Sequence, residues 1–333
     1  DKGNVVVLAE KKVVEKVEHK EIEISLPDAK KIDPNLQIED LVQVEVTPRD
    51  FGRIAAQKAK QVVVQKIREA ERDLLFNSYQ EKEKEVVTGI IQRNSKDNII
   101  VNLGKIDAIL ADKEQVPGED YPPNGRLKVY VIEVKTSTKG PKVYVSRTHP
   151  DLVKRLFETE VPEVHSGVVE IKSISREAGS RTKIAVHSIK QDVDPVGSCV
   201  GINGSRVSVI VDELNGEKID IIPWNENPAL YIAAALSPSK VVQVAVRKDE
   251  KSAKVVVPDY QLSLAIGKEG QNARLAAKLT GYRIDIKSET QAKAVGFITE
   301  EDMNSDKVIV LDHSEIKVDR DLLQPFDESL FEE

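Results

Sequence analysis

The chain has 333 residues, of which 40% are hydrophobic and 32% charged, and its formal net charge is −7. This length favours several domains. No apolar run approaches the roughly 18 residues that cross a bilayer, and the opening residues lack the pattern of a signal peptide, so we expect no membrane partner. A single cysteine, Cys199, excludes an internal disulfide and favours a cytoplasmic location.

The charge is unevenly distributed along the chain. The segment from Ser288 to Glu333 holds 13 acidic and 4 basic residues, a balance of −9, so the rest of the chain carries +2. Residues 227–287 hold 10 basic and 5 acidic residues. A polyanionic partner requires a local basic surface rather than a basic chain, so the negative total does not exclude a nucleic acid.

The first 84 residues predict a small sheet and one long helix. Short alternating segments within residues 4–46 are typical of strands, with a short helix expected at 27–31. Over residues 49–84, apolar residues from Phe51 to Leu75 recur near a period of about 3.6 residues. This pattern predicts an amphipathic helix that packs on the sheet and ends as a rigid connector to the next domain.

Residues 85–148 predict an all-β domain. Five candidate strands are separated by turns rich in Gly, Asn and Pro, which is typical of a small closed barrel of the OB type; they are 86–93, 98–103, 106–110, 126–134 and 142–146. The order of Gly89, Val101–Gly104 and Val143–Arg147 resembles an S1 domain. Barrels of this kind bind single strands with basic grooves and stacking aromatics. Ile99 and Ile100 stand where S1 domains usually carry aromatics, which leaves open whether the barrel contacts RNA or serves as a spacer.

Two segments of the remaining chain repeat each other. The tetrads Gly201-Ile202-Asn203-Gly204 and Gly267-Lys268-Glu269-Gly270 lie 66 residues apart, and the Ile-Asp-Ile strands that follow them lie 65 apart. Each tetrad separates two expected helices, and the second helix ends near a glycine suited to a left-handed cap. A lone Gly-x-x-Gly is usually an ordinary turn, but two copies in the same context indicate a duplicated domain.

The chemistry of the tetrad fits a sugar-phosphate backbone. Its glycines let a ligand backbone approach without obstruction by a Cβ atom, and the amides of the following helix point free donors at phosphate oxygens. This is the arrangement by which KH domains hold about four nucleotides. The sequence does not match the Gly-x-x-x-x-Gly-Lys-Ser/Thr motif, so we do not expect nucleoside triphosphate binding.

Charged residues around the tetrads extend the candidate site. Arg206 and Arg274 fall in the first turns of the following helices, where a cation opposes the helix dipole unless an anion binds. Ile266 is expected either in the core or as the floor of an apolar groove, and Arg181 and Lys183 are expected in a turn, as surface residues or as part of the RNA track. The predicted RNA-binding residues are Gly201, Ile202, Asn203, Gly204, Arg206, Arg181, Lys183, Ile266, Gly267, Lys268, Glu269, Gly270, Gln271 and Arg274.

Several long segments resemble the NusA family of bacterial transcription elongation factors, and the resemblance runs from about residue 4 to 290. The segments that carry it are Pro48–Gln57, Lys139–Pro141, Tyr144–Arg147, Asp194–Gly201, Gly216–Ile221, Ala265–Gly267 and Gly270–Ala276. The resemblance implies two partners, RNA polymerase and nascent single-stranded RNA, and also other elongation or antitermination factors. It implies effects on pausing, termination and antitermination.

The expected fold is multidomain α+β. We expect an N-terminal polymerase-binding domain with its connector helix at 1–84, an S1 barrel at 85–148, two tandem type II KH domains at 149–226 and 227–290, and an acidic tail at 291–333. The tail is expected either to be a disordered solubilising extension or to dock as a mimic of RNA or as a peptide on polymerase.

Three departures from the family pattern limit what the resemblance implies. The helices that normally open the N-terminal domain are absent before Val5, so this domain is expected to be truncated. The first tetrad has Ile202-Asn203 where a basic residue is common, and the second places Glu269 beside Lys268. We therefore expect the first tetrad to be the weaker clamp.

No motif indicates an enzyme. The five histidines share no metal-ligand spacing, and no Cys-x-x-Cys or catalytic triad signature occurs, so we expect no catalytic residue, metal or cofactor. S1 and KH domains also accompany phosphorolytic exoribonucleases, but this chain has no room for a large catalytic domain. A ribosome-associated or RNA-processing factor with S1 and KH domains remains the alternative.

Overall fold

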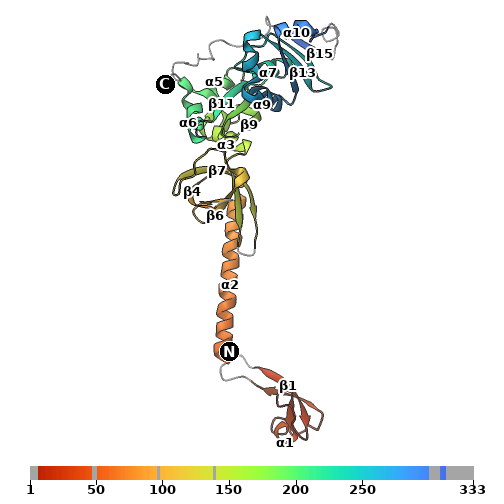
Figure 1. Cartoon of the computed structure of the whole chain (residues 1–333). Helices are drawn as coiled ribbons and strands as arrows, with labels where there is room; N and C mark the ends of the chain where they lie inside the picture. Colours follow the sequence, from red (N-terminus) through yellow and green to blue (C-terminus); the bar gives the residue numbers. More distant parts are fainter. Residues whose placement is uncertain (1–6, 47–50, 96–97, 138–139, 300–307, 313–333) are drawn as a thin grey trace. The chain divides into compact units, whose positions relative to one another are not determined.

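The computed structural model describes residues 7–46, 51–95, 98–137, 140–299 and 308–312 (Figure 1). The chain divides into two compact units, residues 1–74 and residues 75–333.

The first unit contains a three-stranded sheet. Strand β1 (Leu8–Val14) lies between β2 (Glu23–Ser25), to which it is parallel, and β3 (Leu41–Glu45), to which it is antiparallel. A one-turn helix, α1 (Leu26–Ala29), follows β2 because Ser25 caps it and Pro27 stands in its first turn. The small core consists of Val13, Ala29 and Val42.

Helix α2 (Phe51–Gln80) is the longest element of the structure's described part. The predicted packing of its apolar face on the sheet is not observed, because Val62, Val63 and Ile67 are 55%, 56% and 52% exposed. The last turns of the helix are different: Tyr79 is buried in the core of the following domain, and its hydroxyl donates to the carbonyl oxygen of Leu103 over 3.0 Å.

The second unit begins with the predicted barrel. Its strands close in the order β4-β5-β6-β8-β7, and they are β4 (Val86–Ser95), β5 (Asn98–Asn102), β6 (Asp107–Ala111), β7 (Arg126–Lys135) and β8 (Lys142–Ser146). Alternate residues point inward, so the interior is filled mainly by valine, leucine and isoleucine. A Cβ atom at Gly89 of β4 would collide with Cγ1 of Val101 on the neighbouring strand β5, so glycine is required at this position. The expected five-stranded OB-type barrel is therefore confirmed.

The first KH domain is a three-stranded sheet covered by helices. Its helices are α3 (Pro150–Glu160), α4 (Pro162–His165), α5 (Pro195–Val200) and α6 (Ser205–Glu213), and its strands are β9 (Val169–Glu177), β10 (Arg181–Ser188) and β11 (Lys218–Pro223). The central strand β10 is antiparallel to β9 and parallel to β11. Helices and sheet share one core, which includes the buried Cys199.

The second KH domain repeats this arrangement. Its helices are α7 (Pro228–Ala235), α8 (Leu262–Ile266), α9 (Gln271–Thr280) and α10 (Glu289–Val295), and its strands are β12 (Gln243–Arg247), β13 (Ser252–Val257) and β14 (Arg283–Ser288). Strand β13 is antiparallel to β12 and parallel to β14, as β10 is to β9 and β11. The predicted pair of KH domains is thus present.

Part of the acidic tail joins this sheet. Strand β15 (Val308–Asp312) pairs antiparallel with β12, from Val308 opposite Arg247 to Asp312 opposite Gln243. For these five residues the expectation of a disordered extension is wrong, because their backbone continues the sheet. The rest of the tail from residue 300 onward lies outside the described residues.

Buried polar contacts connect the barrel to the first KH domain. Arg147, which follows β8 and is 1% exposed, forms an ion pair with Glu119 and donates to the carbonyl oxygens of Lys128 and Glu213, both over 2.9 Å. Glu119 comes from the barrel and Glu213 from the end of α6. A guanidinium with several fixed partners holds both elements in one orientation.

The two KH domains are also packed against each other. One hydrophobic cluster contains Ala185 and Ile222 of the first domain together with Ile232, Val255 and Ala276 of the second. The hydroxyl group of Ser173 in the first domain donates to the carbonyl oxygen of Leu279 in the second over 2.9 Å. The hydroxyl group of Tyr231, also in the second domain, donates to the same oxygen over 3.1 Å. The domains therefore form a continuous body rather than two modules on a flexible tether.

Candidate nucleic-acid interface

The two tetrads have the same backbone conformation. Gly201 has φ 76° and ψ 172°, and Gly267 has φ 77° and ψ 170°. The third residue of each tetrad, Asn203 or Glu269, has φ 53°, and the last glycine has φ 75° or 77°. Three residues of each loop thus lie in the region of positive φ that L side chains rarely adopt.

The first glycine of each tetrad also lies against the following helix. A Cβ atom at Gly201 would lie 2.8 Å from Cγ of Arg206, and one at Gly267 would lie 2.8 Å from the backbone nitrogen of Asn272. The last glycine has more room, since the nearest atoms to a Cβ at Gly204 are 3.8 Å away. The first position therefore requires glycine because of both its positive φ and the lack of space for a Cβ atom. The last position requires it because of its positive φ alone.

Helices α6 and α9 begin directly after the loops. Their N-caps are Gly204 and Gly270, and no side chain within the described residues caps either helix. The first amides of each helix are therefore available as donors, and the helix dipole favours an anion at that end. This feature, predicted from the sequence, is present in both domains.

The middle residues of the tetrads are exposed. Ile202 is 86% exposed, and Asn203, Lys268 and Glu269 are also exposed. Ile266, the last residue of α8, is 38% exposed, so it lies at the surface beside the second loop rather than in the core. The first loop thus offers an apolar side chain and an amide, and the second offers one cation and one carboxylate.

Arg206 is held beneath the first loop. Its Nη1 donates to the carbonyl oxygen of Ser198 over 2.5 Å and to Oε2 of Glu163 over 2.9 Å. Its stem packs where a Cβ on Gly201 would lie. The guanidinium therefore ties α4, α5 and α6 together.

Arg274 lies in the first turns of α9, beside the second loop, and its Nη1 donates to the carbonyl oxygen of Glu269 over 3.1 Å. Its Nε and Nη2 donate to the two carboxylate oxygens of Glu177, over 2.6 and 3.2 Å. Gln271 donates to Glu177 as well, over 2.9 Å, and to the hydroxyl of Ser180 over 2.8 Å. The hydrogen bond from Arg274 lowers the pKa of Glu177, so the carboxylate is charged at neutral pH.

Arg181 and Lys183 lie in strand β10, not in the predicted turn, because the turn ends at Ser180. Arg181 forms a bidentate ion pair with Asp220, with both distances 2.8 Å. Lys183 donates to the same carboxylate and to the carbonyl oxygen of Ser237, both over 2.7 Å, and its side chain is 0% exposed. Burial lowers the pKa of Lys183, and Asp220 opposes this effect.

The structure thus places Lys183 at the junction of the two KH domains, out of reach of a ligand. The prediction that it extends an RNA track is corrected on this ground. An ammonium group with no exposed surface and two short hydrogen bonds cannot also contact phosphate.

Sequence reasoning missed the carboxylates around the loops. Glu217, which is 1% exposed, accepts hydrogen bonds from Arg176, Thr182 and the amide of Gly179. It fixes the turn between β9 and β10 that carries Ser180 toward Gln271. Glu177 and its partner Arg274 are 97 residues apart, so no local pattern signals their contact.

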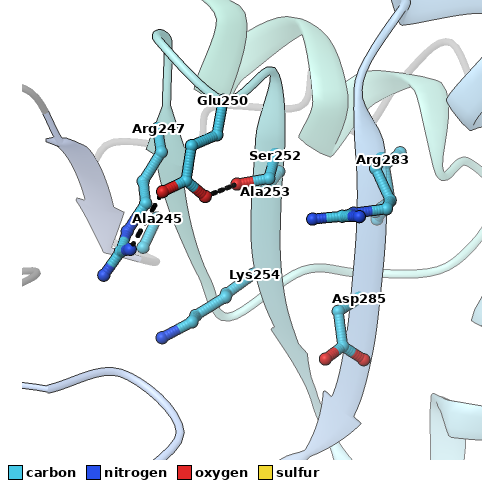
Figure 2. Close-up of a pocket in the computed structure, with 9 residues that line it drawn as sticks. Ala245, Arg247, Glu250, Ser252, Ala253, Lys254, Arg283 and Asp285 are labelled. Atoms are coloured by element: carbon cyan, nitrogen blue, oxygen red, sulfur yellow. Dashed lines mark hydrogen bonds and ion pairs between the residues drawn. The ribbon is translucent and has the colours of Figure 1, made fainter.

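A hollow of about 450 Å³ lies on the second KH sheet (Figure 2). Figure 2 shows Arg247 and Glu250 on one side of it and Arg283 and Asp285 on the other, with Lys254 between them. Arg247 pairs with Glu250 over 3.5 Å. Arg247 and Lys254 alternate with the core valines of β12 and β13, so the hollow lies on the face of the sheet opposite the buried core.

The described residues contain no group of three or more His, Cys, Asp or Glu side chains placed to hold a metal ion. Burial raises the pKa of the Cys199 thiol to about 12, so it is not a thiolate at neutral pH. No helix among the described elements has the length and apolar character required to span a membrane.

The chain has an OB-type barrel followed by two KH domains, and each KH domain has an exposed Gly-x-x-Gly loop at the start of a helix. This arrangement defines a tandem KH protein of the RNA-binding class. Family models describe the same parts: a NusA N-terminal domain over residues 1–73, a NusA-like first KH domain over 147–224 and a NusA-like second KH domain over 228–294.

Curated relatives cover most of the chain. It is 56% identical over 312 residues to the transcription termination/antitermination protein NusA of Halalkalibacterium halodurans, covering 94% of this chain and 81% of the relative. It is 56% identical over 299 residues to the protein of that name in Bacillus subtilis, covering 90% and 81%. A solved N-terminal domain of the Bacillus subtilis protein is 54% identical and covers 21% of this chain and 56% of that one, with a TM-score of 0.18. The chain belongs to the NusA family.

Proposed function

We propose that this protein is an RNA-binding factor of bacterial transcription that associates with RNA polymerase and nascent single-stranded RNA. In this proposal it modulates pausing, termination and antitermination, acts in the cytoplasm together with other elongation or antitermination factors, and has no catalytic activity. Its family membership and the names of its relatives support this role.

The observation that carries the proposal is the pair of matched loops in one packed unit. Each loop offers helix amides to a phosphate, and neither clamp alone holds more than about four nucleotides. Because the KH domains pack together, binding at one loop raises the effective concentration of RNA at the other. The domain limits proposed from the sequence are 1–84, 85–148, 149–226, 227–290 and 291–333.

The proposed RNA contacts follow from accessibility. They are the glycines and helix amides of both tetrads, with Ile202, Asn203, Lys268 and Glu269 between them, and Ile266, Gln271 and Arg274 beside the second loop. Arg206 and Arg181 would contribute from partly buried ion pairs. Lys183 is omitted because it is buried.

A variant with four aspartates tests whether the two tetrads bind RNA. The variant Ile202→Asp, Asn203→Asp, Lys268→Asp, Glu269→Asp should lose on the order of a hundredfold in affinity for single-stranded RNA, because carboxylates would face the phosphates. Aspartate tolerates the positive φ of positions 203 and 269, so the fold should persist. The measurement is fluorescence anisotropy with labelled RNA, with thermal unfolding as the check on folding.

A neutral variant at the same loops is the matched control. Ile202→Gln with Lys268→Gln keeps the amide donors and adds no negative charge, so it should lose only a few-fold in affinity. Unchanged RNA binding by the four-aspartate variant would show that the tetrads are not the clamps.

Polymerase association is tested by retention of purified bacterial RNA polymerase on the immobilised full chain, with ribosomal subunits in a parallel sample. Retention of polymerase supports the proposal. Retention of ribosomal subunits alone would instead support a ribosome-associated factor.

A further inference from the structure

The second clamp is in contact with the first KH domain through one carboxylate. Glu177 ends β9 of the first domain, yet it accepts hydrogen bonds from Arg274 and Gln271, both on the helix that begins at the second loop. Arg274 in turn donates to the carbonyl oxygen of Glu269, inside the tetrad. The guanidinium that contacts the loop backbone is therefore paired with an anion from a neighbouring domain.

The geometry of this pair is that of a phosphate contact. The guanidinium donates from Nε and Nη2 to the two oxygens of Glu177, over 2.6 and 3.2 Å. Arginine binds carboxylate and phosphate with the same two-pronged arrangement of donors. Glu177 thus takes up the donors that an RNA phosphate at the second loop would use.

The pair is also accessible. The side chain of Arg274 is 46% exposed and that of Glu177 is 24% exposed. Exposed ion pairs are weak, because water solvates both charges once they separate. A phosphate already held by the helix amides can therefore replace the carboxylate without leaving a buried charge unpaired.

The first clamp lacks such an exchangeable pair. Arg206 and Glu163 are about a third exposed, but Nη1 of Arg206 also donates to the carbonyl oxygen of Ser198 at the end of α5. Release of Arg206 would leave that carbonyl without this donor and would also shift a stem that packs against Gly201 beneath the loop. Exchange is therefore expected at the second clamp.

We propose that Glu177 is an internal competitor of RNA at the second KH loop: it holds Arg274 in the free protein, and an RNA phosphate displaces it on binding. This inference rests on the proposed RNA-binding function. It makes a residue of the first KH domain a positioning residue that sets the affinity of the second.

The test is Glu177→Gln, which keeps the shape of the side chain and removes its charge. Its affinity for single-stranded RNA should rise about two- to fivefold, the range expected when one exposed ion pair no longer competes. Binding should also become more salt-dependent, with the slope of log affinity against log salt steeper by about 0.7, because the variant has no displaced carboxylate to take up a cation when Arg274 neutralises a phosphate.

Two variants isolate the effect. In an Arg274→Ala background, Glu177→Gln should change affinity and slope no more than a charge-matched control does, since the arginine that it frees is gone. Glu170→Gln is the matched control, because it changes the net charge by the same amount as Glu177→Gln. Glu170 lies on the same strand but pairs with Lys172. A merely structural role of Glu177 would not move the salt slope.

The outcomes separate this inference from the proposed function. Unchanged or weaker RNA binding by Glu177→Gln, in a protein whose four-aspartate variant loses RNA, overturns the competitor model and leaves the clamps intact. RNA binding that survives the four aspartates overturns the proposed clamps, whatever Glu177→Gln does.

Discussion

The two KH domains share a loop backbone but stabilise it with different side chains. The fifth residue after the first glycine is Arg206 in one domain and Asn272 in the other. Arg206 uses an ion pair and a carbonyl contact, whereas Asn272, which is 3% exposed, donates to the carbonyl oxygens of Leu236 and Ala265 over 3.0 and 3.1 Å. A loop conformation can thus be conserved within one chain while the chemistry beneath it changes.

The difference has a consequence at the surface. A neutral amide supports the second loop from below, and the arginine of this domain, Arg274, lies two residues later, on the loop's outer side. In the first domain the corresponding position is Ser208, and the arginine is used beneath the loop. The second loop therefore has Lys268 and Arg274 near its surface, and the first has neither.

The largest expected effect concerns a buried carboxylate that only the first domain has. Glu217→Gln should lower the free energy of unfolding by roughly 3–5 kcal/mol, because Arg176 would remain buried without its charged partner. The corresponding residue of the second domain is Tyr282, so Tyr282→Phe serves as the comparison and should cost far less. Urea unfolding measures both, and a loss under about 1 kcal/mol for Glu217→Gln would contradict the assigned role.

The same residue predicts an acid dependence. Burial raises the pKa of Glu217, but hydrogen bonds from Arg176, Thr182 and Gly179 outweigh it, so the pKa lies below its ordinary value. The stabilisation is therefore complete above the ordinary carboxyl pKa and is lost as the pH falls through the lowered one. The difference in stability between wild type and Glu217→Gln should shrink in that acidic range.

An intermediate effect distinguishes the two glycines of one loop. Gly267→Ala should destabilise the second domain more than Gly270→Ala, because its Cβ would lie 2.8 Å from a backbone nitrogen, whereas at Gly270 the nearest atom is 4.0 Å away. The second change costs only the positive φ, about 1 kcal/mol. Thermal unfolding of both variants checks the order, and equal losses would mean that φ alone requires glycine there.

The smallest expected effect tests whether its lower charge makes the first loop the weaker of the two proposed clamps. Ile202→Lys gives the first loop the cation that Lys268 gives the second, at a position that is 86% exposed. RNA affinity should rise a few-fold, with the salt slope steeper by about 0.7. If affinity falls instead, the apolar side chain of Ile202 contributes more than a phosphate contact would.

Local patterns predicted most of the fold. The alternation of the five barrel segments and the paired glycines of the tetrads are signals within short windows, and both elements stand where the sequence placed them. Contacts between distant residues were not predictable in this way. Glu217 lies 41 residues from Arg176, and both are charged residues that composition alone would place at the surface.

Two predictions were wrong, each for its own physical reason. Gly179-Ser180 correctly marked a turn, but the turn is so short that Arg181 and Lys183 already belong to the strand, where alternation directs Lys183 inward. The apolar face of α2 was expected to pack on the sheet because hydrophobic periodicity indicates a buried face, yet it does not say which surface provides the burial.

The buried ammonium of Lys183 gives the tandem domains a property of their own. By joining Asp220 of the first domain to the carbonyl oxygen of Ser237 in the second, it helps to fix the separation of the two loops. Under the proposed function, two clamps at a fixed separation would select RNA by spacing. An RNA whose contacted segments are set apart by the right number of nucleotides would engage both, and one with an inserted or deleted nucleotide would have to bulge or stretch to do so. Spacing would then help to decide which transcripts are held.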